Sequence, residues 1–218
     1  MKKAVIFDLD GTLVDSLGDI ERSVNYAMSQ FNYPIITTER AREVVGPGAR
    51  NLVKLALNTE VEEQKFEQIL NVYNNTYTNC DHSKTYVYDG IPKLLQKLKK
   101  QGFLIIICTN KPQETTDVVY EKLLKQYGFD GVFGQTEGGY LKPDKRCVLS
   151  ILEKFNVLPE NCFVVGDMLP DYQVGVNSGT TAISTLWGYG KLQDLKNSGQ
   201  TLFANTPEEV YSIISKNL

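Results

Sequence analysis

The stretch FDLDGTLVDS at residues 7–16 decides how the rest of the chain is interpreted. It follows the apolar residues 4–6, so Asp8 and Asp10 stand at the end of a predicted buried strand. A carboxylate in such a place costs free energy unless a partner neutralises it or a function uses it. Taken alone, Asp10-Gly11-Thr12 fits a tight turn equally well. A calcium-binding loop does not fit, because Gly11 is the fourth residue of DLDGTLVDSLGD instead of the sixth.

The composition is that of an ordinary globular protein. The chain has 218 residues, of which 42% are hydrophobic and 22% charged, and its formal net charge is −3. Because there is no cationic excess to neutralise phosphate backbones, we expect no nucleic-acid partner. The apolar stretch behind Lys2 and Lys3 is too short for a signal peptide, and no later run reaches membrane-spanning length. We therefore expect a cytoplasmic protein without a membrane partner.

The cysteines and the histidine exclude several kinds of site. Cys80, Cys108, Cys147 and Cys162 are scattered without a CxxC pair, which is typical of free thiols in a reducing compartment. His82 is the only histidine, so a histidine-dependent catalytic triad and a multi-histidine metal site are both excluded.

The spacing of the apolar residues differs between two parts of the chain. After the opening strand the spacing is helical up to residue 79, and Ser16 with Asp19 forms an expected capping box for the first helix. These helices are expected at residues 16–31, 38–45, 49–58 and 61–79. From residue 86 onward, helices alternate with continuous apolar strands, expected at residues 103–108, 131–133, 162–165 and 181–186. One intervening helix is expected from about residue 112 to 128, and Thr206 with Glu209 forms a capping box for the closing helix.

Helices that alternate with uninterrupted apolar strands predict a parallel sheet covered on both faces. We therefore expect an α/β protein with a Rossmann-like three-layer core around a central parallel sheet, formed by residues 1–14 and 83–218. Residues 15–82 are expected to form an inserted all-α domain.

Polar side chains follow three of the predicted strands, at the edge where parallel sheets bind ligands, and Lys142 stands at the start of a predicted helix. Several carboxylates at one edge repel each other unless a cation is present, and an all-oxygen cluster suits Mg²⁺. Hydroxyl, amide and backbone N–H groups could bind the oxygens of a phosphoryl group, and a lysine could neutralise the charge that spreads over them. The residues at this edge are Asp8, Asp10, Gly11 and Thr12, then Thr109, Asn110 and Lys111, then Lys142, and finally Asp167 and Asp171. This set predicts phosphoryl chemistry.

Four short stretches resemble the motifs of the haloacid dehalogenase superfamily of phosphohydrolases. The likeness covers residues 8 to about 190, and the insert resembles the small helical cap that this superfamily places after its first motif. The matching stretches are Asp8-Leu9-Asp10-Gly11-Thr12, Thr109-Asn110, Lys142-Pro143, and Gly166-Asp167 with Asp171. Two departures are Lys145, where the family often has a second proline, and Met168, where it often has a small hydroxyl residue.

The resemblance implies a role for each matching residue. Asp8 would be the nucleophile that forms an aspartyl-phosphate, and Asp10 would protonate the leaving oxygen and then activate water. Mg²⁺ would be held by Asp8, the carbonyl of Asp10 and Asp167, with the help of Asp171. The transferring phosphoryl group would be bound by Thr109, Asn110 and Lys142, and the cap would close over the substrate.

Asp10 also selects among the reactions of the superfamily. Members that cleave C–halogen or P–C bonds lack this second acid, so its presence leaves phosphate esters. Phosphohexose mutases keep both aspartates but also use a cap histidine, whereas His82 lies near the end of the predicted cap. A mutase is therefore disfavoured.

Phosphoglycolate phosphatases and their relatives show the nearest resemblance. It rests on Thr109-Asn110-Lys111, Val45-Gly46-Pro47-Gly48 and Trp187-Gly188-Tyr189-Gly190. In this interpretation Arg50 reaches a substrate carboxylate; the alternative is a solvated arginine. Lys111 either orients the cap or only caps a strand end.

The expected function is Mg²⁺-dependent hydrolysis of a small phosphorylated metabolite by a monomer or homodimer. Two alternatives stay open on the same scaffold: an inorganic pyrophosphatase, nucleotidase or sugar phosphatase, and a non-catalytic regulatory or binding protein. The second is disfavoured because Asp8, Asp10, Lys142 and Asp167 are all intact.

Overall fold

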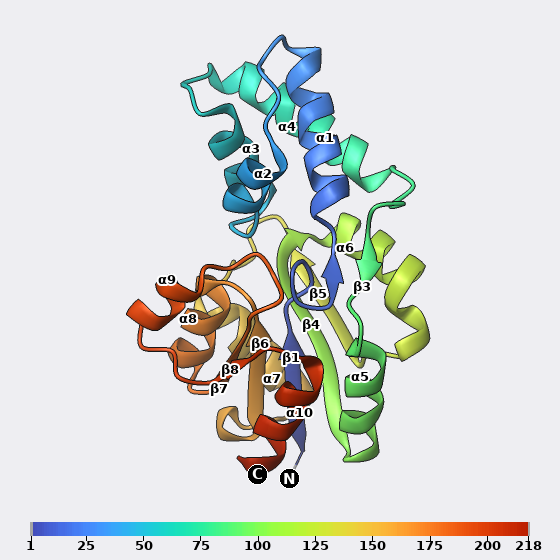
Figure 1. The fold of residues 1–218 in the computed structure, drawn as a ribbon, viewed down its shortest axis with the longest axis vertical. Coiled ribbons are helices and arrows are strands. Elements are labelled where there is room, and N and C mark those ends of the chain that lie inside the picture. Colours follow the sequence, from blue (N-terminus) through green and yellow to red (C-terminus); the bar gives the residue numbers. More distant parts are fainter. Residues whose placement is uncertain (1, 218) are drawn as a thin grey trace.

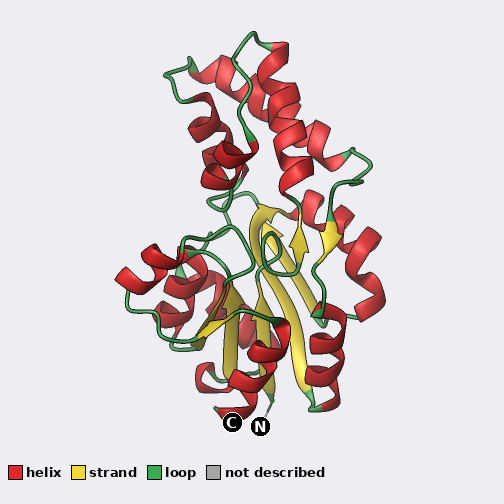
Figure 2. Cartoon of the chain, viewed as in Figure 1, coloured by secondary structure: helices red, strands yellow, loops and turns green. Residues whose placement is uncertain are grey.

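The structure is a computed structural model that describes residues 2–217. Its centre is a six-stranded parallel sheet in the order β5-β4-β1-β6-β7-β8, with helices on both faces (Figures 1 and 2). This confirms the expected α/β core. The strands of the sheet are β1 (Lys3–Phe7), β4 (Phe103–Pro112), β5 (Gly131–Gln135), β6 (Cys162–Gly166), β7 (Thr181–Thr185) and β8 (Phe203–Ala204).

Strand β1 lies between β4 and β6 and sends its side chains into two separate hydrophobic layers. Val5 and Phe7 face a cluster that includes α5 (Ile91–Lys100) and α10 (Pro207–Lys216), whereas Ala4 and Ile6 face α7 (Lys145–Phe155) and α8 (Leu169–Ser178). All four side chains are fully or almost fully buried. A near-continuous apolar strand is what a sheet covered on both faces requires. The remaining helices of the core are α6 (Gln113–Val119) and α9 (Leu192–Asn197).

Four of the five helices between β1 and β4 form a helical insert with a hydrophobic cluster of its own. Figure 1 shows it as a separate lobe above the carboxyl edge of the sheet. The chain enters it through β2 (Val14–Asp15) and leaves it through β3 (Tyr86–Val87), and these two short strands pair with each other in antiparallel fashion. The helices of the insert are α1 (Leu17–Gln30), α2 (Thr38–Val44), α3 (Ala49–Leu57) and α4 (Glu63–Thr78).

Most expected elements are present, with differences where segments are short or irregular. The helix expected up to residue 128 is α6 followed by a π-helical turn, Tyr120–Leu124, and a 3₁₀ turn, Lys125–Tyr127. It ends at Gly128, whose φ of 62° is accessible to glycine without strain. The pair β2–β3, strand β8 and helix α9 were not expected from the sequence, because two-residue strands and a six-residue helix carry little periodicity. Within residues 2–217, no helix has the length and apolarity that a bilayer crossing needs.

The capping box expected at the start of α1 is wrong. Ser16 is the N-cap residue, but its hydroxyl donates to Oδ1 of Asp10 at 2.5 Å, and Asp19 accepts hydrogen bonds from Lys84 N and Thr85 Oγ1. A hydrogen bond to a carboxylate is stronger than one to a neutral backbone group, so the Asp10 carboxylate outcompetes the helix end.

At α10 half of the expected box is confirmed. The Thr206 hydroxyl accepts from Glu209 N at 3.2 Å. The Glu209 carboxylate, however, accepts from the N–H of Asn205 instead of the N–H of Thr206. The side chain of Glu209 also binds the Asn205 amide, which draws it one residue upstream.

Candidate active site

The predicted site residues of the core lie at the carboxyl edge of the sheet, where the strand order reverses at β1. Strands β4 and β5 lie on one side of β1, and β6, β7 and β8 lie on the other. The hydrogen bonding between β1 and β6 continues one residue past the end of β1, because Asp8 N donates to the carbonyl of Val165 at 2.9 Å. This pairing brings Asp8 at the end of β1 beside Asp167 at the end of β6. Ligands bind at such a topological switch in open α/β sheets.

Three carboxylates meet at this edge. One oxygen each from Asp8, Asp167 and Asp171 lies within 4.8 Å of the other two. Asp167 is fully buried, and it accepts hydrogen bonds from Thr12 Oγ1 at 3.0 Å and Tyr189 N at 2.7 Å. Three hard oxygen donors this close together fit a divalent cation such as Mg²⁺.

Burial raises the pKa values of two of these acids. Burial, together with the negative charges of Asp171 and Asp8, raises the pKa of Asp167 to about 8. Burial also raises the pKa of Asp8 to about 6, although Lys142 opposes the shift. Such carboxylates are poorly neutralised by the protein alone, and a bound cation would stabilise their ionised forms.

Lys142 joins two of the acids. Its Nζ donates to Asp8 Oδ1 and to Asp171 Oδ1, each at 2.6 Å. Burial alone would lower the pKa of Lys142, but Asp171 and Asp8 outweigh burial and raise it, so the lysine is a cation. Asn110 holds the backbone of Lys142 from both sides, since its Oδ1 accepts from Lys142 N at 2.8 Å and its Nδ2 donates to Lys142 O at 3.1 Å.

The backbone N–H groups of the turn after Asp10 donate hydrogen bonds to nearby backbone carbonyls. Gly11 has a φ of 82°, and a Cβ there would lie 2.5 Å from Asp167 Oδ2, so only glycine fits beside the acid. Its N–H donates to Val14 O at 2.8 Å, and Thr12 N donates to Leu9 O at 3.4 Å. The two amides expected to bind a phosphoryl group are therefore engaged in the turn, which closes too tightly to leave them free.

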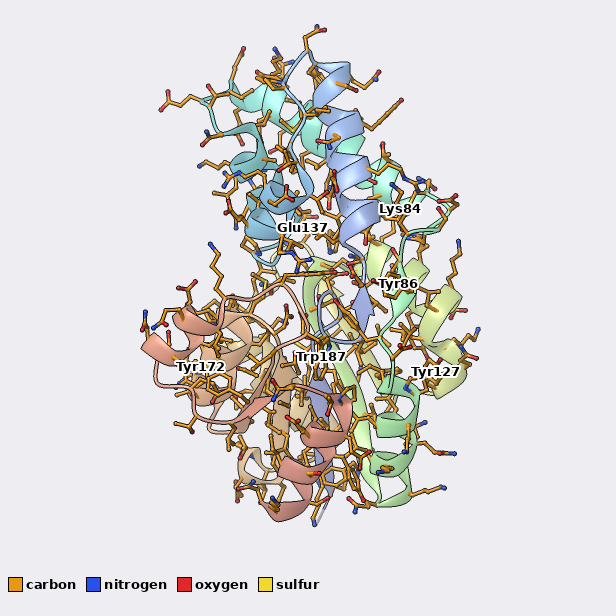
Figure 3. The ribbon with its side chains drawn as sticks, in the orientation of Figure 1. Lys84, Tyr86, Tyr127, Glu137, Tyr172 and Trp187 are labelled. Atoms are coloured by element: carbon orange, nitrogen blue, oxygen red, sulfur yellow. The ribbon has the colours of Figure 1, made fainter. Side chains whose placement is uncertain are left out.

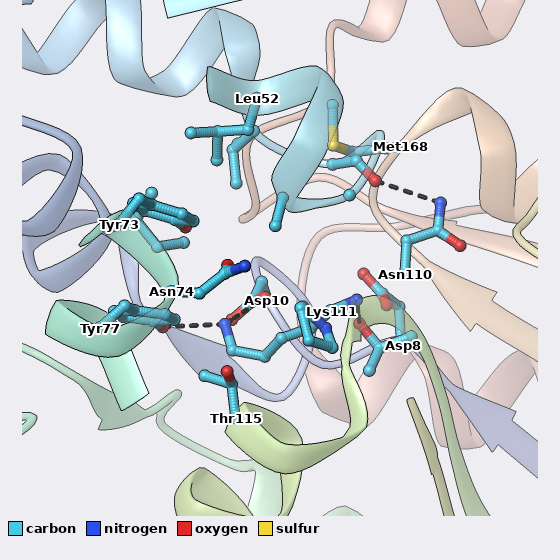
Figure 4. A pocket seen from close by; sticks show the side chains of 17 residues that line it. Asp8, Asp10, Leu52, Tyr73, Asn74, Tyr77, Asn110, Lys111, Thr115 and Met168 are labelled. Atoms are coloured by element: carbon cyan, nitrogen blue, oxygen red, sulfur yellow. Dashed lines mark hydrogen bonds and ion pairs between the residues drawn. The ribbon is translucent and has the colours of Figure 1, made fainter. Parts of the chain in front are cut away.

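Asp10 faces a pocket between the core and the insert (Figure 4). The cavity has a volume of about 40 Å³, and Asp8, Asp10, Thr109, Asn110 and Lys111 line its core side. The insert contributes three groups of lining residues: Ile20 of α1; Val45, Gly46, Gly48, Ala49 and Leu52 from the loop 45–48 and α3; and Tyr73, Asn74 and Tyr77 of α4. The loop contacts the core directly, because Asn110 Nδ2 donates to Gly46 O at 3.2 Å.

Arg50 does not join this pocket. It lies on an exposed face of the insert, where its guanidinium pairs with Glu63 and Glu67 and stacks 4.9 Å from the ring centroid of Phe66. The expected contact between Arg50 and a substrate carboxylate is therefore not supported here. The two glutamates of α4 satisfy both terminal nitrogens of the arginine and hold it on the far side of α3.

The sequence matches a family model in the region that forms this site. The model described as haloacid dehalogenase-like hydrolase matches residues 5–185, which include the aspartates of the site, Lys111 and Lys142. The chain belongs to the haloacid dehalogenase-like hydrolase family. This confirms the family resemblance seen in the sequence.

Relatives of this haloacid dehalogenase-like hydrolase include phosphatases. The phosphoglycolate phosphatase of Psychrobacter arcticus is 31% identical over 214 residues, which cover 92% of this chain and 90% of that protein. The phosphoglycolate phosphatase of Aquifex aeolicus is 30% identical over 87% of each chain. A crystal structure of a predicted phosphatase from Clostridium acetobutylicum has 26% identity and a TM-score of 0.86, with 99% of each chain covered.

Two residues of the haloacid dehalogenase-like hydrolase site received no role from the sequence, although Tyr189 stood in one of the stretches that carry the resemblance. Tyr189 binds Asp167 through its backbone and the start of α1 through its hydroxyl. Tyr77 binds Lys111 at 2.8 Å across the pocket. Tyr73 and Tyr77 share one face of α4 by their spacing of four, a signal that fits core packing equally well. Figure 3 shows Trp187, two residues before Tyr189, on the core side of the junction, and Lys84 beside the foot of α1.

Proposed function

We propose that this chain is a Mg²⁺-dependent phosphatase that hydrolyses small phosphate monoesters through an aspartyl-phosphate on Asp8. The observation that carries the proposal is the position of Asp8. It shares Lys142 with Asp171, lies within 4.8 Å of Asp167, and opens onto the same cavity as Asp10. Phosphatase activity is also what the names of the relatives state for those proteins.

The proposed mechanism assigns one task to each side chain. An oxygen of Asp8 attacks phosphorus, and the bond from phosphorus to the ester oxygen breaks as Asp10 gives that oxygen a proton. Asp10 then takes a proton from water, which attacks phosphorus and releases phosphate from Asp8. Lys142 holds Asp8 in position and offsets negative charge on the phosphoryl oxygens. Thr109 lines the cavity beside them, whereas Asn110 orients the backbone of Lys142.

The metal would be held by Asp8, Asp167 and Asp171, together with the carbonyl of Asp10. A bound Mg²⁺ supplies positive charge that polarises the phosphoryl group. The donor set supports this proposal, because it consists of oxygens, and because a bound cation would oppose the rise that burial causes in the pKa values of Asp8 and Asp167.

We also propose that residues 15–82 act as a cap on a core of residues 1–14 and 83–218. Loop 45–48 and helix α4 line the cavity from above, so the insert shields the reacting groups from water. A cytoplasmic monomer or homodimer stays a prediction.

A phosphoglycolate-sized ester is the substrate class that we propose. The insert closes over a cavity of about 40 Å³, so any ester needs the insert to move and a short leaving group needs the smallest displacement. The curated relatives named above support the same class.

The test is a screen for phosphate release with Mg²⁺ and with EDTA. Phosphoglycolate, pyrophosphate, a nucleotide and a sugar phosphate are compared, with Asp8→Asn as the control for the nucleophile. We expect release from phosphoglycolate to need Mg²⁺ and to fall by on the order of 10⁴-fold or more in Asp8→Asn. Circular dichroism verifies that the variant is folded. Full activity in folded Asp8→Asn would overturn the mechanism, and faster release from pyrophosphate or a nucleotide would overturn the substrate class.

A further inference from the structure

Lys111 is the only cationic side chain among the residues that line the cavity, within the part of the chain that the structure describes. It follows Asn110 at the end of β4, and 4% of its side chain is exposed. The two other charged groups on the cavity wall are Asp8 and Asp10. An anionic group on a substrate would therefore find one cation in the cavity, and that cation already has partners.

The ammonium group of Lys111 has three hydrogen-bond acceptors around it (Figure 4). It donates to Asp10 Oδ1 at 2.8 Å, to Asp10 Oδ2 at 2.7 Å and to the Tyr77 hydroxyl at 2.8 Å. Asp10 Oδ1 also accepts from the hydroxyl of Ser16. Both oxygens of the proposed acid thus accept hydrogen bonds from Lys111 in this arrangement.

We propose that Lys111 is the specificity residue for a leaving group that carries a carboxylate next to its ester oxygen. The substrate carboxylate takes the ammonium of Lys111 away from Asp10. Asp10, without its cation, takes up a proton from solvent and donates it to the ester oxygen as the bond from phosphorus to that oxygen breaks. A carboxylate one carbon from the ester oxygen lies near enough to contact a cation that already touches the proton donor. A neutral alcohol has no group that can replace Asp10 as a partner of Lys111. The proposal rests on the function proposed above.

Tyr77 adds the insert to this recognition. Its ring centroid lies 4.3 Å from Lys111 Nζ, and the adjacent Thr78 hydroxyl is hydrogen-bonded to Thr115 of α6 at 2.7 Å. Helix α4 thereby contacts the core at Lys111 and at Thr115. Tyr77 is the contribution of the insert to the position of the lysine, whereas Asp10 is the contribution of the core.

The experiment compares two esters that differ only in charge. Wild type and Lys111→Met are assayed with 2-phosphoglycolate and with its uncharged amide, 2-phosphoglycolamide. We expect the wild type to prefer the carboxylate, and the ratio of the two kcat/KM values to fall by about 30-fold or more in Lys111→Met, the effect of removing one partner of a buried charge pair. Tyr77→Phe should lower the ratio in the same direction by a smaller factor.

Lys54→Met is the matched control, because Lys54 is an exposed lysine of α3 that does not line this cavity. It should leave the ratio unchanged. General damage by Lys111→Met would lower both kcat/KM values together, so an unchanged ratio overturns the specificity role and leaves Lys111 as a residue that only positions Asp10. A wild type without preference for the carboxylate, but with Asp8-dependent release from other esters, overturns this inference alone. Release from no ester overturns the proposed function.

Discussion

Tyr189 connects the buried acid Asp167 to the first turn of the insert. Its backbone N–H donates to Asp167 Oδ2 at 2.7 Å, while its phenolic oxygen accepts from Ser16 N at 2.8 Å and Leu17 N at 3.2 Å. The same hydroxyl donates to Asp15 Oδ1 at 3.0 Å. One residue therefore holds an acid of the proposed metal site and the point at which the chain enters the insert.

Replacing Tyr189 with Phe should destabilise the protein without changing the contacts to Asp167, which come from the backbone. The buried N–H of Ser16 would lose its acceptor, at a cost of about 1–3 kcal/mol. Urea denaturation measures the change in the free energy of unfolding. Tyr26→Phe is the control, since the Tyr26 side chain is half exposed. Equal midpoints for the two variants would contradict the assigned role of the hydroxyl.

Gly166→Ala should remove activity through Asp171. A Cβ at Gly166 would lie 2.2 Å from Asp171 Cγ, so the carboxylate must move away from Lys142. We expect kcat/KM to fall by on the order of 100-fold, because displacement of a reacting group by about 1 Å has an effect of that size. Gly102→Ala is the control. A Cβ at Gly102 would have no neighbour within 4 Å, but the φ of 80° is strained for alanine, so this variant should lose about 1–2 kcal/mol of stability and keep its activity. Comparable activity of the two variants would speak against the clash.

His82 should make stability depend on pH. Burial lowers its pKa below the ordinary 6.5, and Lys111 and Lys122 add to the shift, while Asp19 opposes it. Above pH 6.5 the histidine is neutral in both the folded and the unfolded state, and the stability is complete. As the pH falls below 6.5 the unfolded chain binds a proton that the folded protein resists, so the free energy of unfolding decreases.

The test of this pH dependence is His82→Asn, because asparagine tolerates the φ of 49° at this position. Urea denaturation at pH 7.5 and pH 5.5 should show a larger loss of stability for the wild type than for the variant. Cys80, whose Sγ lies 3.6 Å from His82 Nδ1, is present in both proteins and does not affect the comparison. Parallel losses in the two proteins would exclude His82 as the source.

Arg50→Ala should change phosphoglycolate and phosphoglycolamide hydrolysis equally little. Arg50 pairs with Glu63 and Glu67 on an exposed face, and pairs of this kind contribute about 0–1 kcal/mol to stability. Steady-state kinetics with both esters checks the expectation. A selective loss for the carboxylated ester would restore the role expected from the sequence and would weaken the assignment of specificity to Lys111.

The core of the site was predictable because it needs only the order of strands along the chain. Asp8, Thr109 and Asp167 each follow an apolar run of residues, and parallel strands place their carboxyl ends at one edge. Lys142 and Asp171 do not stand directly after a strand, and the family motifs supported their inclusion in the site. These positions depend on local sequence and on topology, not on the packing of one particular side chain.

The contacts between the insert and the core were not predictable in this way. Whether Arg50 or Lys111 faces the cavity depends on how α3 and α4 lie over the sheet, and no local pattern specifies that arrangement. The capping box expected at Ser16 failed for a related reason, since its competitor Asp10 belongs to the core. Periodicity reports which face of a helix is buried, but not which partner covers it.

The short antiparallel pair of β2 and β3 has an evolutionary consequence. Val14 pairs with Val87 and Asp15 with Tyr86, so the two ends of a segment of about seventy residues lie one ladder step apart. A loop with adjacent ends can lengthen, shorten or be exchanged for another without pulling on the strands that hold the acids. The chain can therefore acquire a new substrate preference by replacement of this segment, while the reaction itself is inherited unchanged.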